Sequence, residues 1–250
     1  MQANPVPGRR IVHIVGGGTL SHVRNHLALA APAYGSTARR LAELCGTFWP
    51  SVDIDLHLTK MADPSSTLVT NDDLRELAGN ITADYRSKVV IWNPAVADFR
   101  GSIHSGREDK PAQESGKYAE RLKSNRNYLM ALVPDDKLVG MFRRDSVNGK
   151  APRKDIFLVA FKTTCGVSQQ EMYSAGLALV KTASANLVLV NDTKTRVNMI
   201  VTPEEASYHV TTDRDEALRG LLEMTYLRSQ LTFTRSTVVA GDPVAWDSEL

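Results

Sequence analysis

The chain has 250 residues, 42% of them hydrophobic, which is enough for one sizeable core. Its 30 basic and 28 acidic residues almost cancel, and no dense Lys/Arg run occurs, so the charge pattern favours no nucleic-acid partner. No apolar stretch of about 18 or more residues is present, so we expect no membrane span. The first ten residues lack a signal-peptide pattern, and Cys45 and Cys165 stand far apart without a CxxC motif, so we expect a reduced, cytoplasmic protein.

Apolar runs alternate with helical patterns along the chain. Strands are predicted at 9–15, 51–59, 88–92, 127–133, 155–162 and 186–191, and a small hairpin at 196–202 and 207–212. Helices are predicted from near Gly35 through Cys45, and at 71–80, 135–144, 172–183 and 218–225.

Continuous hydrophobic strands that alternate with helices are typical of a mostly parallel sheet covered on both faces. We therefore predict an α/β fold: a Rossmann-like sheet with helices on both faces and a small antiparallel extension near the C-terminal part. Residues 1–235 should form one nucleotide-binding domain, with a mobile polar segment at about 100–126. Residues 236–250 are weakly patterned and are predicted to be a tail.

Ligands of parallel sheets bind at the carboxyl ends of the strands. That rule selects the ends at 16–19, 93–99, 161–164 and 191–192. The stretch "KVVIWNPAVADF" (88–99) is one of them, because a buried strand ends there in small residues and Asp98. A carboxylate at this rim could face a ligand or Mg²⁺, and the alternative is an ordinary turn cap.

Common sequence motifs are mostly missing. In "GGGTLS" the third glycine of a dinucleotide fingerprint falls on Ser21, which leaves a nicotinamide oxidoreductase as a weak alternative. No P-loop, HExxH, GxSxG or clustered Cys/His pairs occur, so a zinc site is not expected. His22 and His26, four residues apart, could share a helix face.

Several short motifs occur in the order known from one enzyme family. They are "IVGGGT…VR" (14–24), "AVADF" (95–99), "GK" (116–117), "LVAFKTT" (158–164) and "ANLVLVNDTKTRVNMIVT" (185–202). Together they resemble phosphopantothenoylcysteine synthetases, the phosphopantothenate–cysteine ligases of coenzyme A synthesis, over residues 10 to 228. The resemblance implies a homodimeric ligase that uses Mg²⁺ and CTP or ATP. The nucleotide activates the carboxylate of 4′-phosphopantothenate, and the amine of cysteine then attacks the acyl-nucleotide.

The resemblance also implies roles for individual residues. Asp98, Lys117 and Asn25 would be catalytic, with Asp98 also at the metal and Lys110 as the rival of Lys117. The implied nucleotide-binding residues are Gly17, Gly18, Thr19, Ala95, Val96, Asp98, Phe161, Lys181 and Asn191. Arg24, Gly35 and Ser36 would bind phosphate. Ordinary roles remain the alternative for several of them, such as core packing for Phe161 and a strand-end turn for Asn191.

The loop at 25–37 departs from the family pattern. Without a gap, Ala28 stands where the family has an asparagine, and Ala30, Ala31 and Pro32 replace its Ser-Ser-Gly. With a gap, Asn25 supplies the asparagine, but the serines are still missing. The second hypothesis is therefore a catalytically degenerate homologue that binds a nucleotide or metabolite as a sensor or sequestering protein.

Overall fold

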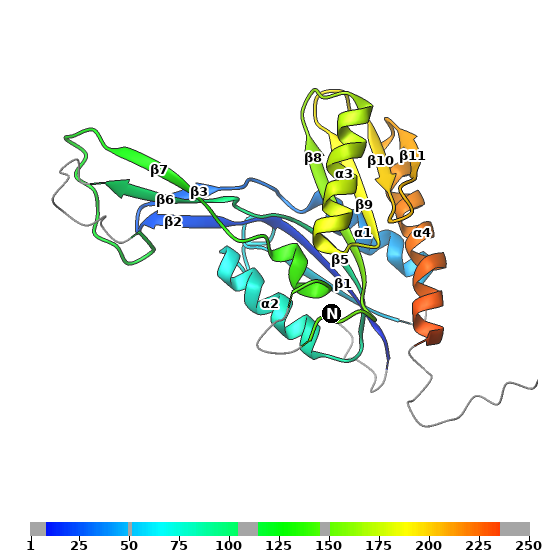
Figure 1. Cartoon of the computed structure of the whole chain (residues 1–250). Coiled ribbons are helices and arrows are strands. Elements are labelled where there is room, and N and C mark those ends of the chain that lie inside the picture. Colours follow the sequence, from blue (N-terminus) through cyan, green and yellow to red (C-terminus); the bar gives the residue numbers. More distant parts are fainter. Residues whose placement is uncertain (1–8, 50–51, 105–114, 146–150, 236–250) are drawn as a thin grey trace, which may run out of the picture.

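The structure is a computed structural model that describes residues 9–49, 52–104, 115–145 and 151–235 (Figure 1). Its main element is a seven-stranded sheet in the order β11-β10-β9-β8-β5-β1-β4. These strands are β1 (Ile11–Gly18), β4 (Asp53–Leu58), β5 (Ser87–Ala95), β8 (Phe157–Thr164), β9 (Leu187–Asp192), β10 (Asn198–Val201) and β11 (Ser207–Thr211). The strands from β9 to β4 run parallel, whereas β10 and β11 pair antiparallel. The predicted α/β fold and its antiparallel extension are confirmed.

Helices cover both faces of this sheet. On one face, α1 (Ser36–Phe48) and α4 (Arg214–Arg235) pack over a core that includes Val12 and Ile14 of β1. On the other face lie α2 (Asn71–Ala83), α3 (Gln169–Ala183) and the 3₁₀ helix η1 (Leu138–Phe142), over a core that includes Val15. All residues of β1 are buried, as expected for a strand between two covered faces.

The helix starts have clear local causes. Thr70 caps α2 by accepting a hydrogen bond from the Asp73 amide, and the Asp73 carboxylate bonds back to the cap. The helix begins at Asn71, where the predicted helix at 71–80 begins, and it continues to Ala83. The predicted helix at 135–144 is wrong in type and length, because only the η1 turn forms there.

Four strands form an arm that projects from the main sheet (Figure 1). It consists of β2 (Leu20–Arg24), β3 (Leu27–Ala30), β6 (Phe99–His104) and β7 (Leu129–Pro134), paired as the hairpins β2–β3 and β6–β7. The hairpin β2–β3 was not predicted, and it places His22 on a strand and His26 in a turn rather than on one helix face. The first part of the predicted mobile segment forms β6, and residues 105–114 lie outside the described residues.

The order of the strands creates a switch point. From β1 the chain passes to β4 on one side and then to β5 on the other, so the connections diverge between β1 and β5. Ligands of open α/β sheets bind in the crevice at the carboxyl ends of such a pair. In the described part of the chain, no helix is both long and apolar enough to cross a membrane.

Candidate functional site

Three glycines at the end of β1, Gly16 to Gly18, form the first wall of the switch point, and this segment is called the glycine turn. Gly17 has a φ of 100°, a conformation that side chains disfavour. A Cβ on Gly18 would lie 2.0 Å from the carbonyl oxygen of Ala31, and one on Gly16 would lie 2.3 Å from the Cβ of Ala38. The turn therefore needs glycines because it packs directly against α1 and the segment that leads into it.

Thr19 joins this turn to the end of β5. Its fully buried hydroxyl donates to Oδ1 of Asn71 at 2.7 Å and accepts from the Ala97 amide at 2.9 Å. The Thr19 amide donates to the Ala95 carbonyl at 3.0 Å, and Asn71 Nδ2 donates to the Ala97 carbonyl at 2.8 Å. Ala95 and Val96 are thereby held beside the glycine turn. Sequence reasoning treated Asn71 as a helix-start residue and missed this role.

The N-terminus of α1 faces the same region. Its cap is Gly35, in the left-handed conformation with a φ of 74°. In the described part of the chain, no side chain caps these amides, and the first turn holds no acidic residue. Ser36 is exposed at the first helical position. Free amides and the helix dipole favour an anion here.

A second group of polar residues lies at the ends of β8, β9 and β10, on the face covered by α1 and α4. Asn191 and Asn198 are paired across β9 and β10. Arg214, the first residue of α4, donates to Oδ1 of Asn198 at 2.7 Å and to the Thr37 hydroxyl at 3.4 Å. Its guanidinium carbon lies 6.0 Å from the centre of the Phe161 ring. Arg214 therefore connects Phe161 to the N-terminal turn of α1.

The charge of Arg214 is not neutralised by a carboxylate. Burial lowers the pKa of its guanidinium, and the positive charge of Arg196 lowers it further. No acidic residue forms an ion pair with Arg214 within the described ranges. A half-buried cation without a counter-ion, next to uncapped helix amides, is suited to binding an anion. The sequence showed no signal for Arg214, since it lies outside every motif.

Asp192 braces the loops beside this group. Its buried carboxylate accepts hydrogen bonds from the amides of Gly166, Val167, Lys194 and Thr195 and from the hydroxyls of Thr164 and Thr195. These bonds, the one from the Thr195 amide first, hold the pKa of the carboxyl well below its usual range. The loops after β8 and β9 are thus tied to one charged group.

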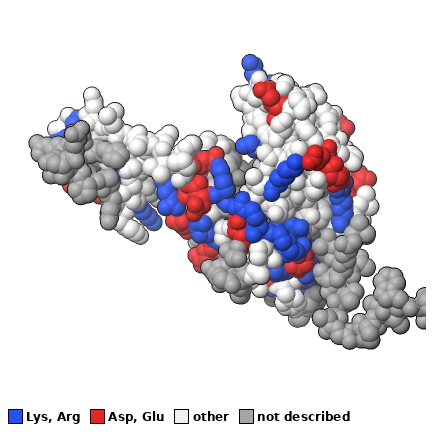
Figure 2. Space-filling view, viewed as in Figure 1, with Lys and Arg blue, Asp and Glu red and all other residues white. Residues whose placement is uncertain are grey.

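A cavity of about 450 Å³ opens where the arm meets the body of the molecule. Its lining includes Thr70 at the cap of α2, together with Arg100, Lys117 and Asp135. Burial alone would raise the pKa of Asp135, but the hydrogen bonds from Arg100 and Asn71 hold it below its usual range. Figure 2 shows acidic and basic side chains interleaved in this part of the surface.

Two predicted catalytic residues, Asp98 and Lys117, have different surroundings. Lys117 lines the cavity, whereas Asp98 is exposed and forms an ion pair with Lys137, a residue that sequence reasoning missed. Lys110 lies outside the described residues. The roles of Asp98 and Lys117 stay predictions.

Three further predicted residues are not brought to the switch point. Lys181 lies on α3, which covers the opposite face of the sheet from Phe161, and it forms an ion pair with Glu205 at 2.7 Å. Arg24 is fully buried in the arm and donates to the Val23 carbonyl at 2.6 Å. Asn25 occupies the turn after β2. The rise of a β-strand, about 3.3 Å per residue, puts it about 20 Å along the chain from the glycine turn.

Comparison with solved structures identifies similar folds. A DNA/pantothenate metabolism flavoprotein from Streptococcus pneumoniae superposes with a TM-score of 0.68 at 17% identity, over 88% of this chain and 100% of that chain. The C-terminal domain of the coenzyme A biosynthesis bifunctional protein CoaBC gives 0.61 at 14% identity, over 91% of this chain and 99% of that one. A Cab2 mutant in complex with phosphopantothenate-cysteine gives a TM-score of 0.59 at 13% identity, over 91% of this chain and 88% of that one.

The chain has a phosphopantothenoylcysteine synthetase-like fold. The resemblance predicted from short motifs is therefore confirmed for the fold. No protein-family model matches the sequence, and no curated protein matches it significantly. At these identities the likeness concerns the arrangement of the backbone.

Proposed function

We propose that this phosphopantothenoylcysteine synthetase-like protein is a ligase that joins 4′-phosphopantothenate to cysteine through an acyl-nucleotide, with CTP or ATP as co-substrate. The observation that carries the proposal is the position of Arg214 between Phe161 and the uncapped N-terminus of α1. An aromatic face, amide side chains and a guanidinium without a carboxylate partner thus lie together at the carboxyl ends of the parallel strands. Such a combination suits a nucleotide, with its base near Phe161 and Asn191 and its phosphates toward α1.

The proposed reaction has two steps, a nucleotidyl transfer and an acyl transfer. A carboxylate oxygen of phosphopantothenate attacks the α-phosphorus, and pyrophosphate leaves. The cysteine amine then attacks the acyl carbon, and the nucleoside monophosphate leaves. Arg214 and the helix amides would stabilise the negative charge of the phosphates in both steps, and Lys117 would do so from the cavity.

Asp98 fits the role of a magnesium ligand. Mg²⁺ in nucleotide sites is held by one or two carboxylates together with phosphates and water. The Asp98 side chain is 58% exposed, and its partner Lys137 is itself exposed and free to shift toward a phosphate. Bound Mg²⁺ would supply charge neutralisation between the attacking carboxylate and the phosphates.

The activity is tested by incubating the chain with phosphopantothenate, cysteine, Mg²⁺ and either CTP or ATP. We expect equal amounts of pyrophosphate and nucleoside monophosphate with one of the two nucleotides. Arg214→Ala should weaken nucleotide binding at least tenfold, whereas Arg219→Ala, an exposed position on the same helix, should leave it unchanged. Lys117→Ala should abolish turnover but keep the fold. If no nucleotide gives either product, the ligase proposal is refuted.

We also propose that the chain forms a homodimer through the arm. Strand β7 exposes apolar side chains to solvent, among them Leu129 at 84%, Leu132 at 54% and Val133 at 49%. Such a surface is costly to hydrate and is typical of a protein interface. Light scattering should give twice the chain mass, and Leu129→Glu should shift the protein toward a monomer. A wild-type monomer at micromolar concentration would contradict this proposal.

A second candidate function is binding without turnover, as a sensor or sequestering protein. The observation that favours it is the segment from Ala28 to Pro32, which offers no side-chain hydroxyl where the family pattern has serines. Calorimetry separates the two candidates. Tight nucleotide binding without product formation supports the binding protein, and turnover with either nucleotide excludes it.

A further inference from the structure

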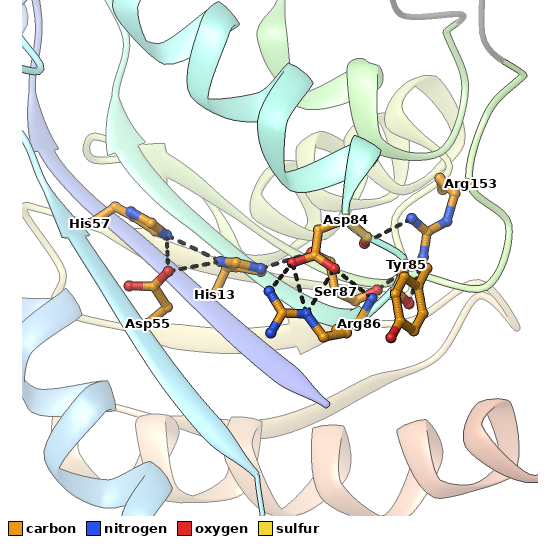
Figure 3. Close-up of polar contacts among 8 residues, drawn as sticks. All are labelled: His13, Asp55, His57, Asp84, Tyr85, Arg86, Ser87 and Arg153. Carbon is orange, nitrogen blue, oxygen red and sulfur yellow. Dashed lines mark hydrogen bonds and ion pairs between the residues drawn. The ribbon is translucent and has the colours of Figure 1, made fainter. Parts of the chain in front are cut away.

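Three side chains on adjacent strands point toward one another, away from the switch point. His13 lies on β1, and Asp55 and His57 lie on the edge strand β4 (Figure 3). The parallel register pairs His13 with Asp55 and Val15 with His57, so all three side chains lie on the same face of the sheet. None of them has a role in the proposed ligase reaction.

The distances match those of a metal site. Nδ1 of His13 lies 3.1 Å from Nε2 of His57, and Oδ2 of Asp55 lies 3.2 Å from the His57 nitrogen and 3.7 Å from the His13 nitrogen. In a tetrahedral zinc site with bonds of about 2.0–2.1 Å, two ligand atoms lie about 3.3 Å apart. The three donor atoms therefore already occupy one face of such a tetrahedron.

The surroundings hold His13 in one orientation. Its Nε2 lies 2.9 Å from the Ser87 hydroxyl, and the residue as a whole is only 5% exposed. Ser87 follows a turn fixed by the ion pair of Asp84 with Arg86 and by Arg153, which donates to the Asp84 and Ser87 carbonyls (Figure 3). When Nε2–H donates to Ser87, the lone pair of Nδ1 faces His57 and Asp55. Fixing a metal-binding histidine through its other nitrogen is the usual outer arrangement of such sites.

The cluster is open to solvent on the side of Asp55. Side-chain exposure increases from 6% at His13 to 19% at His57 and 42% at Asp55, which leaves an open path to solvent.

We propose that His13, Asp55 and His57 bind a divalent transition-metal ion, best matched by Zn²⁺, with water at the fourth position. Two imidazole nitrogens and one carboxylate favour zinc over the all-oxygen surroundings that Mg²⁺ prefers. The ion would link the edge strand β4 to β1. The site is independent of the ligase proposal, because its ligands lie within the strands rather than at their carboxyl ends.

The test uses the full chain without an affinity tag, stripped of metal with a chelator. Titration calorimetry with Zn²⁺ should give one ion per chain, and Co²⁺ should give the visible absorption of a tetrahedral site. His57→Ala and Asp55→Asn should each weaken binding at least tenfold. His26→Ala, which removes an exposed histidine in the arm, is the matched control and should bind as the wild type does.

Circular dichroism and urea midpoints establish that each variant is folded. Asp55→Asn keeps the test decisive if His57→Ala unfolds, because Asp55 is the most exposed of the three. The proposal is overturned if wild type binds neither ion at micromolar concentration, if both variants bind as tightly as wild type, or if equimolar Mg²⁺ displaces Zn²⁺. No substrate is present, so a failed ligase assay has no bearing on the result.

Discussion

Replacing Thr19 with valine tests the bond network that holds the switch point together. The valine keeps the shape of the side chain but removes the hydroxyl. Its loss leaves the Ala97 amide without its acceptor and the side-chain oxygen of Asn71 without its donor. Thr19 is fully buried, so water cannot replace the missing partner.

The expected loss follows from these two groups. A buried donor or acceptor left without a partner costs about 1–3 kcal/mol, so the two groups together should lower the free energy of unfolding of Thr19→Val by roughly 2–6 kcal/mol. In a domain of this size, that corresponds to a melting temperature lower by roughly 4–24 °C. Thr225→Val is the matched control, because this hydroxyl is equally buried but donates only to the Leu221 carbonyl within α4. The control should lose about 1 kcal/mol.

Urea unfolding followed by tryptophan fluorescence measures both variants. We expect a lower midpoint for Thr19→Val with an unchanged slope, which indicates a change in stability rather than in the exposed surface. Thr19→Ser restores the hydroxyl and should recover most of the loss. Equal midpoints for Thr19→Val and Thr225→Val would refute the reasoning, since the two sites differ only in what their hydroxyls hold.

Three other outcomes follow from the structure. Asp192→Asn should lower the melting temperature at pH 7 and flatten its pH dependence. The pKa of Asp192 is lower in the folded than in the unfolded chain, so the carboxylate stabilises the fold fully above about pH 4, and this stabilisation is lost as the pH falls further. A melting curve at pH 3 that still separates wild type and variant as at pH 7 would contradict this. Gly18→Ala should destabilise the fold, because the added Cβ would lie 2.0 Å from a backbone oxygen. Gly46→Ala should stabilise the fold by up to about 1 kcal/mol, because Gly46 is an exposed helical residue with open space around it. Urea midpoints of the two variants that move in the same direction would contradict the packing at Gly18. Burial raises the pKa of the Cys45 thiol to about 12, so a thiol reagent should label only the exposed Cys165 in the native chain and both thiols in urea; two labelled thiols in the native state would show that Cys45 is accessible.

Local signals predicted the sheet well. The central strands β1, β5, β8 and β9 contain continuous apolar runs, and their carboxyl ends could be found from the residues alone. Of the arm, β7 was predicted as the strand at 127–133, whereas the hairpin β2–β3 was missed. Its strands have only five and four residues and are stabilised by pairing with each other and packing on β6. The type of η1 was also missed, because the spacing of its apolar residues matches a longer α-helix.

The candidate site was only partly predictable. Gly18, Thr19 and Ala95 come together as expected because β1 and β5 are neighbours in a parallel sheet. Arg214 could not be predicted, since it reaches Phe161 and Thr37 only through the packing of α4 on α1. The ion pair of Asp98 with Lys137 was not predicted either, because the two residues are far apart in the chain and no motif links them.

By itself, the sequence determined the alternation of buried strands and helices, and with it the parallel sheet and the rim where a ligand binds. These features depend on local hydrophobic patterns, which are present before any long-range contact forms. Only the tertiary structure decided which charged side chains face that rim, and it alone placed His13 beside Asp55 and His57. Strand register brings His13 together with Asp55 and His57, which lie more than forty residues later in the chain, and no local pattern encodes that register.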